Sequence, residues 1–190
     1  SKPVTCASAL MLWEKGKFLF TDPLYDFLPA WKDARVRALD GDGRETTVPL
    51  EHPITVGELF TMTSGLDYNT NGASFAAAKE RLAPECPTVD MINALAGDPL
   101  FRQPGGGWFY GMSHDVLAAV VEVISGMSLR DFAKKNIFEP LGMEDTEYCG
   151  GVIKDSGRAA VLYQFSDETG KYSPIDVQRN GMIFGTEYAS

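Results

Sequence analysis

Lys2 and Tyr110 are the residues whose types and surroundings could carry nucleophilic catalysis. Lys2 stands before Pro3 at the head of an apolar helical pattern, and a lysine can act as base to a serine one helical turn away. Ser1 cannot be that serine, because adjacent residues do not share a helix face. The serine would stand three residues before Lys2, two positions before Ser1 and outside the printed sequence.

Pro3 fixes the place of Lys2 along the helix. Proline lacks an N–H and is tolerated only in the first turn, so the helix starts within about a turn of it. The position three before Lys2 would then lie near a helix N-terminus, whose dipole and free N–H groups favour an alkoxide. The alternative is a solvated lysine at a helix start, and Lys2 taken alone fits that alternative better.

Tyr110 ends the glycine-rich segment PGGGWFY, just before a predicted helix. Loop tips that feed a helix often display functional side chains, and a phenol beside a lysine ammonium could relay a proton. The alternative is that Trp108, Phe109 and Tyr110 pack into the core. Composition favours the core for Trp108 and Phe109 and leaves both possibilities open for Tyr110.

The other reactive side chains are weaker candidates for catalysis. His114 and Asp115 are neighbours in the first turn of a predicted helix and point in different directions, which disfavours a Ser-His-Asp triad. His52 precedes Pro53 and is expected in a loop, and Ser64 is expected to stabilise a turn. The glycines of PGGGW precede aromatic residues instead of a helix, so they do not predict a phosphate cradle.

The composition argues against several classes of binding partner and site. The chain has 17 Lys and Arg against 26 Asp and Glu, a formal net charge of −9, which argues against nucleic acid or an anionic membrane surface as the main partner. No apolar run approaches the roughly 20 residues of a membrane span. The three cysteines, at positions 6, 86 and 149, predict neither a disulfide framework nor a zinc site, and two histidines supply at most part of any metal site.

Hydrophobic spacing predicts a mostly helical chain whose strand character gathers at the C-terminal end. Two segments are expected as loops, ALDGDGRETT and FRQPGGGWFYGM. AAVLYQF and KYSPI are expected as strands joined by the turn SDETG. The predicted helices are 3–16, a capping-box helix from Thr55 to Gly65, 74–82, 88–96, one from its N-cap Ser113 to Gly126, and one capped by Ser128.

Four segments in order resemble the serine β-lactamase-related family, which spans class C β-lactamases, D-alanyl-D-alanine carboxypeptidases and family VIII carboxylesterases. SKPVTCASALMLWEKGKFLFTDPLYDFLP is similar to its active-site helix, whose usual pattern is Ser-x-x-Lys. Three further segments follow in the family's order: HPITVGELFTMTSGL, PGGGWFYGMSHDVLAAVVEVISGMSL and IFEPLGMEDT. In the first of them, Met62 stands where the family usually has His. The resemblance covers nearly all of residues 1–150.

The resemblance implies an α+β fold of the β-lactamase/transpeptidase type, of which this chain is mostly the helical domain with the start of the active-site helix and some strands. It assigns residues 1–20 to the active-site helix, 21–150 to the helical domain, and 151–190 to a truncated return toward the sheet domain. Lys2 matches the lysine of Ser-x-x-Lys and Tyr110 the tyrosine of Tyr-x-Asn. The serine and the Lys-Thr-Gly-like strand have no counterpart here.

Met112 is the departure from the pattern that bears on substrate. It replaces the Asn whose amide normally contacts the acylamide of a β-lactam or peptide, so it occupies the substrate-binding position without the hydrogen bond. The resemblance therefore implies a serine hydrolase with an acyl-enzyme on an ester or amide carbonyl, with esters favoured. Lys2, its pKa lowered by burial and by Tyr110, would take the serine proton, and Tyr110 would pass a proton to the leaving group.

Two alternatives remain at this point: a penicillin-binding-like fold used for binding or regulation, and a true β-lactamase or D-Ala-D-Ala carboxypeptidase. No metal or organic cofactor is implied, and the expected partner is a small-molecule ester or amide substrate, with no nucleic acid and no transmembrane segment. The sequence leaves open the oligomeric state and whether the compartment is bacterial cytoplasm or cell envelope.

Overall fold

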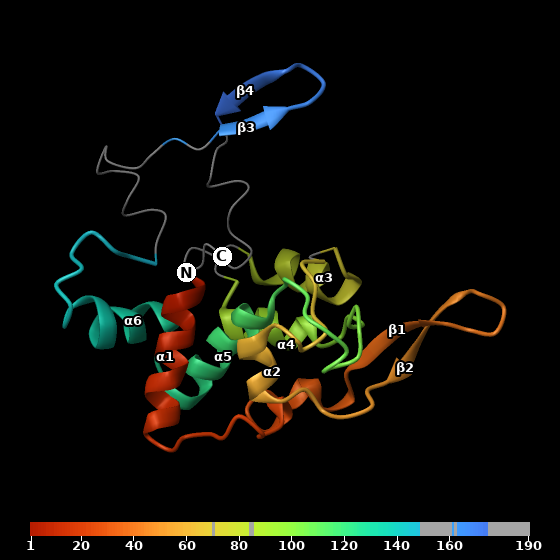
Figure 1. Cartoon of the computed structure of the whole chain (residues 1–190), viewed down its shortest axis with the longest axis horizontal. Helices are drawn as coiled ribbons and strands as arrows, with labels where there is room; N and C mark the ends of the chain where they lie inside the picture. The colour runs from red at the N-terminus through yellow and green to blue at the C-terminus, as the bar shows by residue number, and fades with distance from the viewer. Residues whose placement is uncertain (70, 84–85, 149–160, 162, 175–190) are drawn as a thin grey trace.

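The computed structural model describes residues 1–69, 71–83, 86–148, 161 and 163–174. This part of the chain is mostly helical, with two separate two-stranded antiparallel sheets (Figure 1). In chain order the elements are α1 (Lys2–Glu14), the short 3-10 turns η1 (Leu24–Asp26) and η2 (Pro29–Asp33), β1 (Arg35–Leu39), β2 (Glu45–Pro49), α2 (Val56–Thr61), α3 (Ala73–Leu82), α4 (Thr88–Leu95), α5 (Ser113–Ser125), α6 (Leu129–Ala133), the π-helical turn η3 (Lys134–Phe138), β3 (Tyr163–Ser166) and β4 (Lys171–Pro174).

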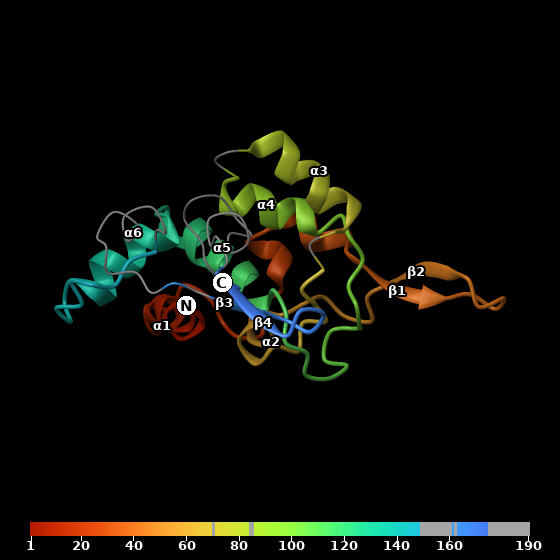
Figure 2. The ribbon, with the colours of Figure 1, turned by 90° about the horizontal axis from the view of Figure 1, so that it is seen from above.

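Helix α5 is the centre of the helical body. It contacts α1, α2, α4 and α6, and α1 lies on the opposite side of it from α3 and α4 (Figure 2). Every residue from Val116 to Val121 is buried, as expected of a helix that is apolar on all sides. The core therefore forms around α5, and the elements that carry the candidate site pack against it.

Helix α1 is held close to α5 by small side chains. Its buried residues include Thr5, Ser8 and Ala9, which let two helix backbones approach closely, and Leu12 adds apolar burial one turn later. Helix α1 runs from Lys2 with Ser1 at its N-cap, and Pro3 lies in the first turn, where it was predicted from the sequence. Lys2 is therefore at the N-terminal end of a helix whose far face is anchored in the core.

The predicted elements are confirmed for several segments. Helices α3 and α4 match the expected 74–82 and 88–96, and the segment before α5 lacks regular structure. Thr55 and Glu58 make the predicted capping box, Gly126 ends α5 in a left-handed conformation, and Ser128 caps α6 through the N–H of Asp131. The two C-terminal strands pair as β3 and β4. Most of residues 151–190, and Cys149, lie outside the described residues.

The expectation of a loop over ALDGDGRETT was wrong at both ends. Its first two and last three residues belong to strands β1 and β2, which pair with Val36 opposite Val48 and extend away from the helices (Figure 1). The turn is tight because Asp40 Oδ1 accepts hydrogen bonds from the N–H groups of Asp42 and Arg44. This side-chain turn lets a polar segment close a hairpin.

Two helix ends also differ from the prediction. Helix α2 ends at Thr61 instead of continuing to Gly65, since Met62 adopts a left-handed conformation with φ 56°. Helix α5 begins with Ser113 inside it and Met112 as N-cap. The hydroxyl of Ser113 is instead 2.9 Å from that of buried Ser64, so it joins the two segments that flank the candidate site.

None of the described helices combines the length and apolar character of a membrane span.

Candidate active site

Lys2 and Tyr110 lie together, and Tyr68 lies with them. The Lys2 ammonium donates a hydrogen bond of 2.6 Å from Nζ to the hydroxyl oxygen of Tyr68. The same Nζ is 5.0 Å from the centroid of the Tyr110 ring and 5.3 Å from that of Tyr68, within the range of a cation–π contact. The two rings are 5.4 Å apart. The fold thus brings together the two residues that the sequence predicted, which are 108 positions apart, and adds Tyr68 as a third.

The two tyrosines come from loops that are tied to each other by their backbones. The N–H of Phe109 donates to the carbonyl of Met62 at 3.0 Å, and that of Met112 to the carbonyl of Asp67 at 3.2 Å. A Cβ at Gly111 would overlap the backbone of Leu66. The loop that carries Tyr110 therefore lies directly on the loop that carries Tyr68, and glycine permits that approach.

The expectation that burial and Tyr110 lower the pKa of Lys2 was wrong in direction. Burial alone does lower the pKa of Lys2, but the hydrogen bond to Tyr68 and the charge of Asp115 more than offset it, so the pKa of Lys2 lies above its ordinary value. Burial raises the pKa of Tyr68 and keeps its phenol protonated, although the hydrogen bond to Lys2 acts against that shift. In this chain Lys2 is an ammonium beside a neutral phenol.

Asp115 is the buried acid of the site. It lies in the first turn of α5, is 6% exposed, and its Oδ2 has no hydrogen-bond partner among the described residues. Burial raises the pKa of Asp115 to about 6, while the charge of Lys2 lowers it. The carboxylate therefore acts on Lys2 through space and is ionised at neutral pH.

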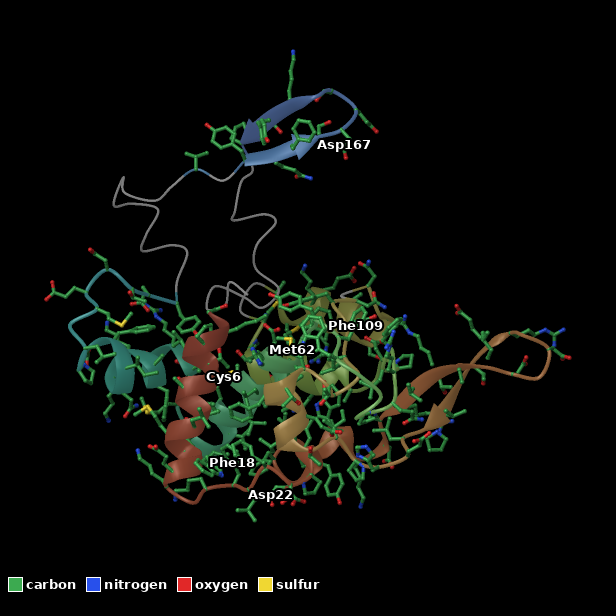
Figure 3. All side chains as sticks on the ribbon, viewed as in Figure 1. Cys6, Phe18, Asp22, Met62, Phe109 and Asp167 are labelled. Atoms are coloured by element: carbon green, nitrogen blue, oxygen red, sulfur yellow. The ribbon has the colours of Figure 1, made fainter. Side chains whose placement is uncertain are left out.

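Cys6 and His114 form a second contact, which joins α1 to α5. Cys6 lies on α1, one helical turn from Lys2 (Figure 3). Cys6 Sγ is 3.6 Å from His114 Nε2, which also lies 3.3 Å from the carbonyl oxygen of Phe60. Burial raises the pKa of the Cys6 thiol and lowers the pKa of His114. The pair is thus a neutral thiol and a neutral imidazole, and Cys6 is half-buried.

The N-terminus of α1 is also fixed from the far end of the described helical body. Tyr148 donates a hydrogen bond from its hydroxyl to the carbonyl of Ser1 at 3.2 Å, and that hydroxyl is 3.4 Å from Thr5 Oγ1. Lys2 lies between these two anchored residues. Its backbone is therefore held while its side chain reaches the tyrosines.

The remaining sequence candidates take other places. Met112 is fully buried in the apolar core, so its side chain has a packing role here, and contact with a substrate stays a prediction. Trp108 is 64% exposed, which makes the expectation of core packing wrong for it, while Phe109 is half-buried. His52 lies in a loop, as expected, where its ring is within hydrogen-bond distance of the Pro53 and Pro104 carbonyl oxygens.

Sequence reasoning missed two members of the site. Tyr68 follows TSGLD in a segment without periodicity, and its only signal was an aromatic residue just beyond a predicted helix end. Asp115 carries no such signal, because the helix dipole alone explains a carboxylate in the first turn of a helix. Among the residues that the structure describes, no group of three or more His, Cys, Asp or Glu side chains could hold a metal ion.

Comparisons with known proteins identify the family of the chain. A beta-lactamase family model matches residues 1–181. Esterase EstB of Burkholderia gladioli is 32% identical over 86% of this chain and 40% of its own length. Lovastatin esterase of Penicillium rubens is 31% identical over 78% of this chain and 38% of its own length. The chain thus spans less than half the length of these curated relatives.

A solved structure shows the same fold. Unliganded simvastatin synthase (LovD) from Aspergillus terreus, as its selenomethionyl derivative, superposes with a TM-score of 0.75 at 24% identity, covering 99% of this chain and 47% of that one. The expected β-lactamase/transpeptidase-like fold is therefore confirmed. By the family model, which matches residues 1–181, the chain belongs to the serine β-lactamase-related family.

Proposed function

We propose that the intact protein is a serine hydrolase that acts through an acyl-enzyme, with Lys2 and Tyr110 as catalytic residues and an ester as the favoured substrate. The single observation that carries this proposal is the position of Lys2 Nζ, 2.6 Å from the Tyr68 hydroxyl and 5.0 Å from the Tyr110 ring centroid. A lysine that faces phenols from two other segments is suited to move a proton to and from the hydroxyl of a serine three residues before it.

The proposed first step forms the acyl-enzyme. A serine three residues before Lys2 attacks the substrate carbonyl, and its proton passes to the neutral amine of Lys2. The tetrahedral oxyanion is held by backbone N–H groups, one of them the serine's own. When the intermediate collapses, the C–O bond to the alcohol breaks, and Tyr110 donates its phenolic proton to the departing alkoxide. The ammonium of Lys2 returns a proton to Tyr110, so Lys2 is again a neutral amine before the second step. An ester between the serine and the acyl group remains.

The second step uses the same groups for water. A water molecule attacks the acyl-serine ester, its proton passes to the amine of Lys2, and the serine leaves with a proton returned to it. The acid product is released and the free enzyme is restored. Because Lys2 is an ammonium at neutral pH, the amine needed for both steps is the minor form, which predicts a rate that rises with pH.

The preference for an ester rests on two kinds of support. Two relatives are esterases by name, EstB and the lovastatin esterase. Met112 carries no side-chain amide for an acylamide group, and its side chain is buried in the core. A small-molecule ester is therefore a better candidate substrate than a β-lactam or a D-Ala-D-Ala peptide.

The proposal is tested by active-site labelling of the intact protein with a fluorophosphonate, followed by mass spectrometric location of the adduct. The expected adduct is on a serine three residues before Lys2. Cleavage of p-nitrophenyl butyrate without turnover of nitrocefin or a D-Ala-D-Ala peptide supports the esterase. Turnover of nitrocefin or the peptide would support a lactamase or peptidase instead. A protein that forms no adduct and cleaves none of these substrates would be a binding fold.

A further inference from the structure

Trp108 is an exposed tryptophan beside the candidate site, and the proposed chemistry does not use it. It is 64% exposed, and its ring centroid lies 6.4 Å from that of Tyr110, with the two ring planes inclined at 36°. The Tyr110 ring in turn lies 5.4 Å from that of Tyr68. The ammonium of Lys2 contacts both tyrosine rings. Three neighbouring aromatic rings therefore connect an exposed indole to the group proposed to act as base.

The backbone around Trp108 is anchored on both sides. The N–H groups of Gly105 and Phe109 each donate a hydrogen bond to a carbonyl of the segment just after α2, at 2.9 and 3.0 Å. Burial alternates through the loop, since Trp108 and Tyr110 are exposed and Phe109 between them is half-buried. Side chains two positions apart in an extended chain point to the same side. The loop therefore presents Trp108 and Tyr110 together.

Phe109 packs the other side of this loop. Its ring centroid lies 4.7 Å from that of Phe101, and the guanidinium carbon of Arg102 lies 5.7 Å from the Phe109 centroid. The loop is thus held through Phe109 and through its backbone, while the indole of Trp108 stays accessible in the described part of the chain.

A lone exposed aromatic side chain needs no explanation, because apolar atoms make up much of any protein surface. Trp13 is such a case: it is 40% exposed at the far end of α1 from Lys2, and its ring stacks on Phe20 at 5.1 Å. Trp108 differs because its ring neighbour is Tyr110 and its backbone is held on both sides. A fixed indole can bind a flat apolar group at little cost in conformational entropy.

Tyr110 indicates which part of a substrate would reach Trp108. In the proposed mechanism Tyr110 donates its proton to the departing alkoxide, so the alcohol oxygen of the ester lies at the Tyr110 hydroxyl. Among the described residues Lys2 makes cation–π contacts with Tyr68 and Tyr110 and none with Trp108, which places the indole outside the proton-transfer groups. The group bonded to the alcohol oxygen is therefore the part of the substrate that can extend onto the indole.

We propose that Trp108 is a specificity-determining residue whose exposed indole stacks on an aromatic ring in the alcohol part of the ester. The favoured substrate class is then an ester of an arylmethyl alcohol. The effect on turnover rests on the proposed serine hydrolase function. The binding of an aromatic ring by Trp108 does not, because it needs no chemical step. Two measurements therefore test the inference.

The first measurement compares the hydrolysis of benzyl, cyclohexylmethyl and propyl butyrate by the intact protein. The esters share an acyl group and have primary alcohols of similar basicity, and benzyl butyrate alone offers an aromatic ring. Trp108→Leu is expected to lower kcat/KM for benzyl butyrate about tenfold or more, to lower that for cyclohexylmethyl butyrate less, and to leave propyl butyrate within about twofold of wild type. Trp108→Phe should retain most of the activity on benzyl butyrate. Trp13→Leu is the matched control and is expected to leave the order of the esters unchanged.

The pattern of losses in Trp108→Leu decides the kinetic test. An equal loss on all the esters would show that Trp108 supports the loop and would overturn the inference. An equal loss on the two ring-bearing esters would overturn the preference for an aromatic ring. A loss on methyl phenylacetate, which carries its ring on the acyl side, without a loss on benzyl butyrate would overturn the assignment to the alcohol part.

The second measurement needs no turnover. The intact protein is labelled with ¹⁵N, and the indole N–H signal of Trp108, assigned by its absence from Trp108→Phe, is followed by NMR as benzyl alcohol is added. The Trp108 signal is expected to shift until it saturates, while the indole signal of Trp13 stays in place. A Trp108 signal that moves no more than that of Trp13 would overturn the inference.

The two measurements distinguish failure of this inference from failure of the proposed function. Turnover of the esters without dependence on Trp108 would overturn the inference and leave the hydrolase intact. A saturable shift of the Trp108 signal in a protein that cleaves no ester and forms no acyl-enzyme would overturn the hydrolase and retain Trp108 as a binding residue for an aromatic ring.

Discussion

Lys2 donates its hydrogen bond to the hydroxyl of Tyr68, at 2.6 Å, and places the same ammonium 5.0 Å from the Tyr110 ring centroid. The lysine is thus fixed by one phenol and covered by another, each from a different loop. This geometry gives the two tyrosines different expected roles. We expect Tyr68 to set the state of Lys2, and we expect Tyr110, which is 52% exposed, to contact the substrate.

Loss of Lys2 or of the Tyr110 hydroxyl should impair turnover. In the intact protein, Lys2→Ala and Tyr110→Phe are each expected to lower kcat/KM for an acyl ester at least tenfold, or about 1.4 kcal/mol of barrier. The measurement is steady-state hydrolysis of p-nitrophenyl butyrate. The control is Tyr172→Phe in the exposed strand β4. Activity within about twofold of wild type for either variant would contradict the role assigned to that residue.

The rate should rise through the alkaline range. Because the hydrogen bond to Tyr68 and the charge of Asp115 outweigh burial, the pKa of Lys2 is raised, and the amine that accepts the serine proton is scarce at neutral pH. We expect kcat/KM to increase steadily from about pH 7 to about pH 9 in the intact protein. A profile flat over that range would show that the group acting as base is already deprotonated at neutral pH.

Tyr68→Phe should change the pH profile more than the fold. The substitution removes the hydrogen bond that raises the pKa of Lys2 and leaves the aromatic packing against Tyr110. The rising limb of kcat/KM should therefore move to lower pH, which a pH titration of the intact protein measures. Tyr172→Phe serves again as the control. A shift to higher pH would contradict the account of how Lys2 is kept charged.

Gly111→Ala should disturb the site without touching any of its side chains. An added Cβ would overlap the backbone of Leu66, and that neighbour cannot move aside as a flexible side chain can. The loops of Tyr68 and Tyr110 would separate, so we expect both a lower melting temperature and at least tenfold lower kcat/KM, about 1.4 kcal/mol of barrier. Gly126→Ala tests the alternative of simple backbone strain, since Gly126 has a positive φ and open space around it. Equal activity loss in both variants would argue against the loop contact.

Asp115 should make the fold less stable as pH rises. The pKa of Asp115 is raised to about 6 in the folded chain, above its ordinary value, so its stabilising protonated form is fully present below about pH 4 and is lost as pH rises through about 6. The difference of about two units corresponds to about 3 kcal/mol.

Asp115→Asn stays uncharged at every pH, so its stability relative to wild type should improve from about pH 4 to about pH 7.5 by up to this 3 kcal/mol. Denaturant unfolding of the intact protein at both values measures the change. The burial-lowered pKa of His114 acts in the opposite direction, as its stabilising neutral form is lost when pH falls, but His114 is present in both proteins. An unchanged difference between the two pH values would contradict the buried charge.

The local pattern of the chain determined its helices and their caps. Thr55 with Glu58, Ser128 with Asp131 and Gly126 follow from short-range hydrogen bonding and backbone sterics, so the sequence predicts them without the fold. The match of Lys2 to the lysine of Ser-x-x-Lys and of Tyr110 to the tyrosine of Tyr-x-Asn came from the family resemblance, and their catalytic roles stay predictions. The hairpin β1–β2 was not predicted, although its Asp40 turn is as local as these caps, because the polar and glycine-broken composition of the segment favoured a loop.

Only the tertiary structure decided what surrounds Lys2. The hydrogen bond to Tyr68 joins residues 66 positions apart, and the charge of Asp115 comes from a third segment. The direction of the Lys2 pKa depends on which of these outweighs burial, and no local pattern contains that balance. The sequence by itself determined that a lysine stands in the first turn of a helix, and the tertiary structure decided that its ammonium is hydrogen-bonded to Tyr68 and that its pKa is raised.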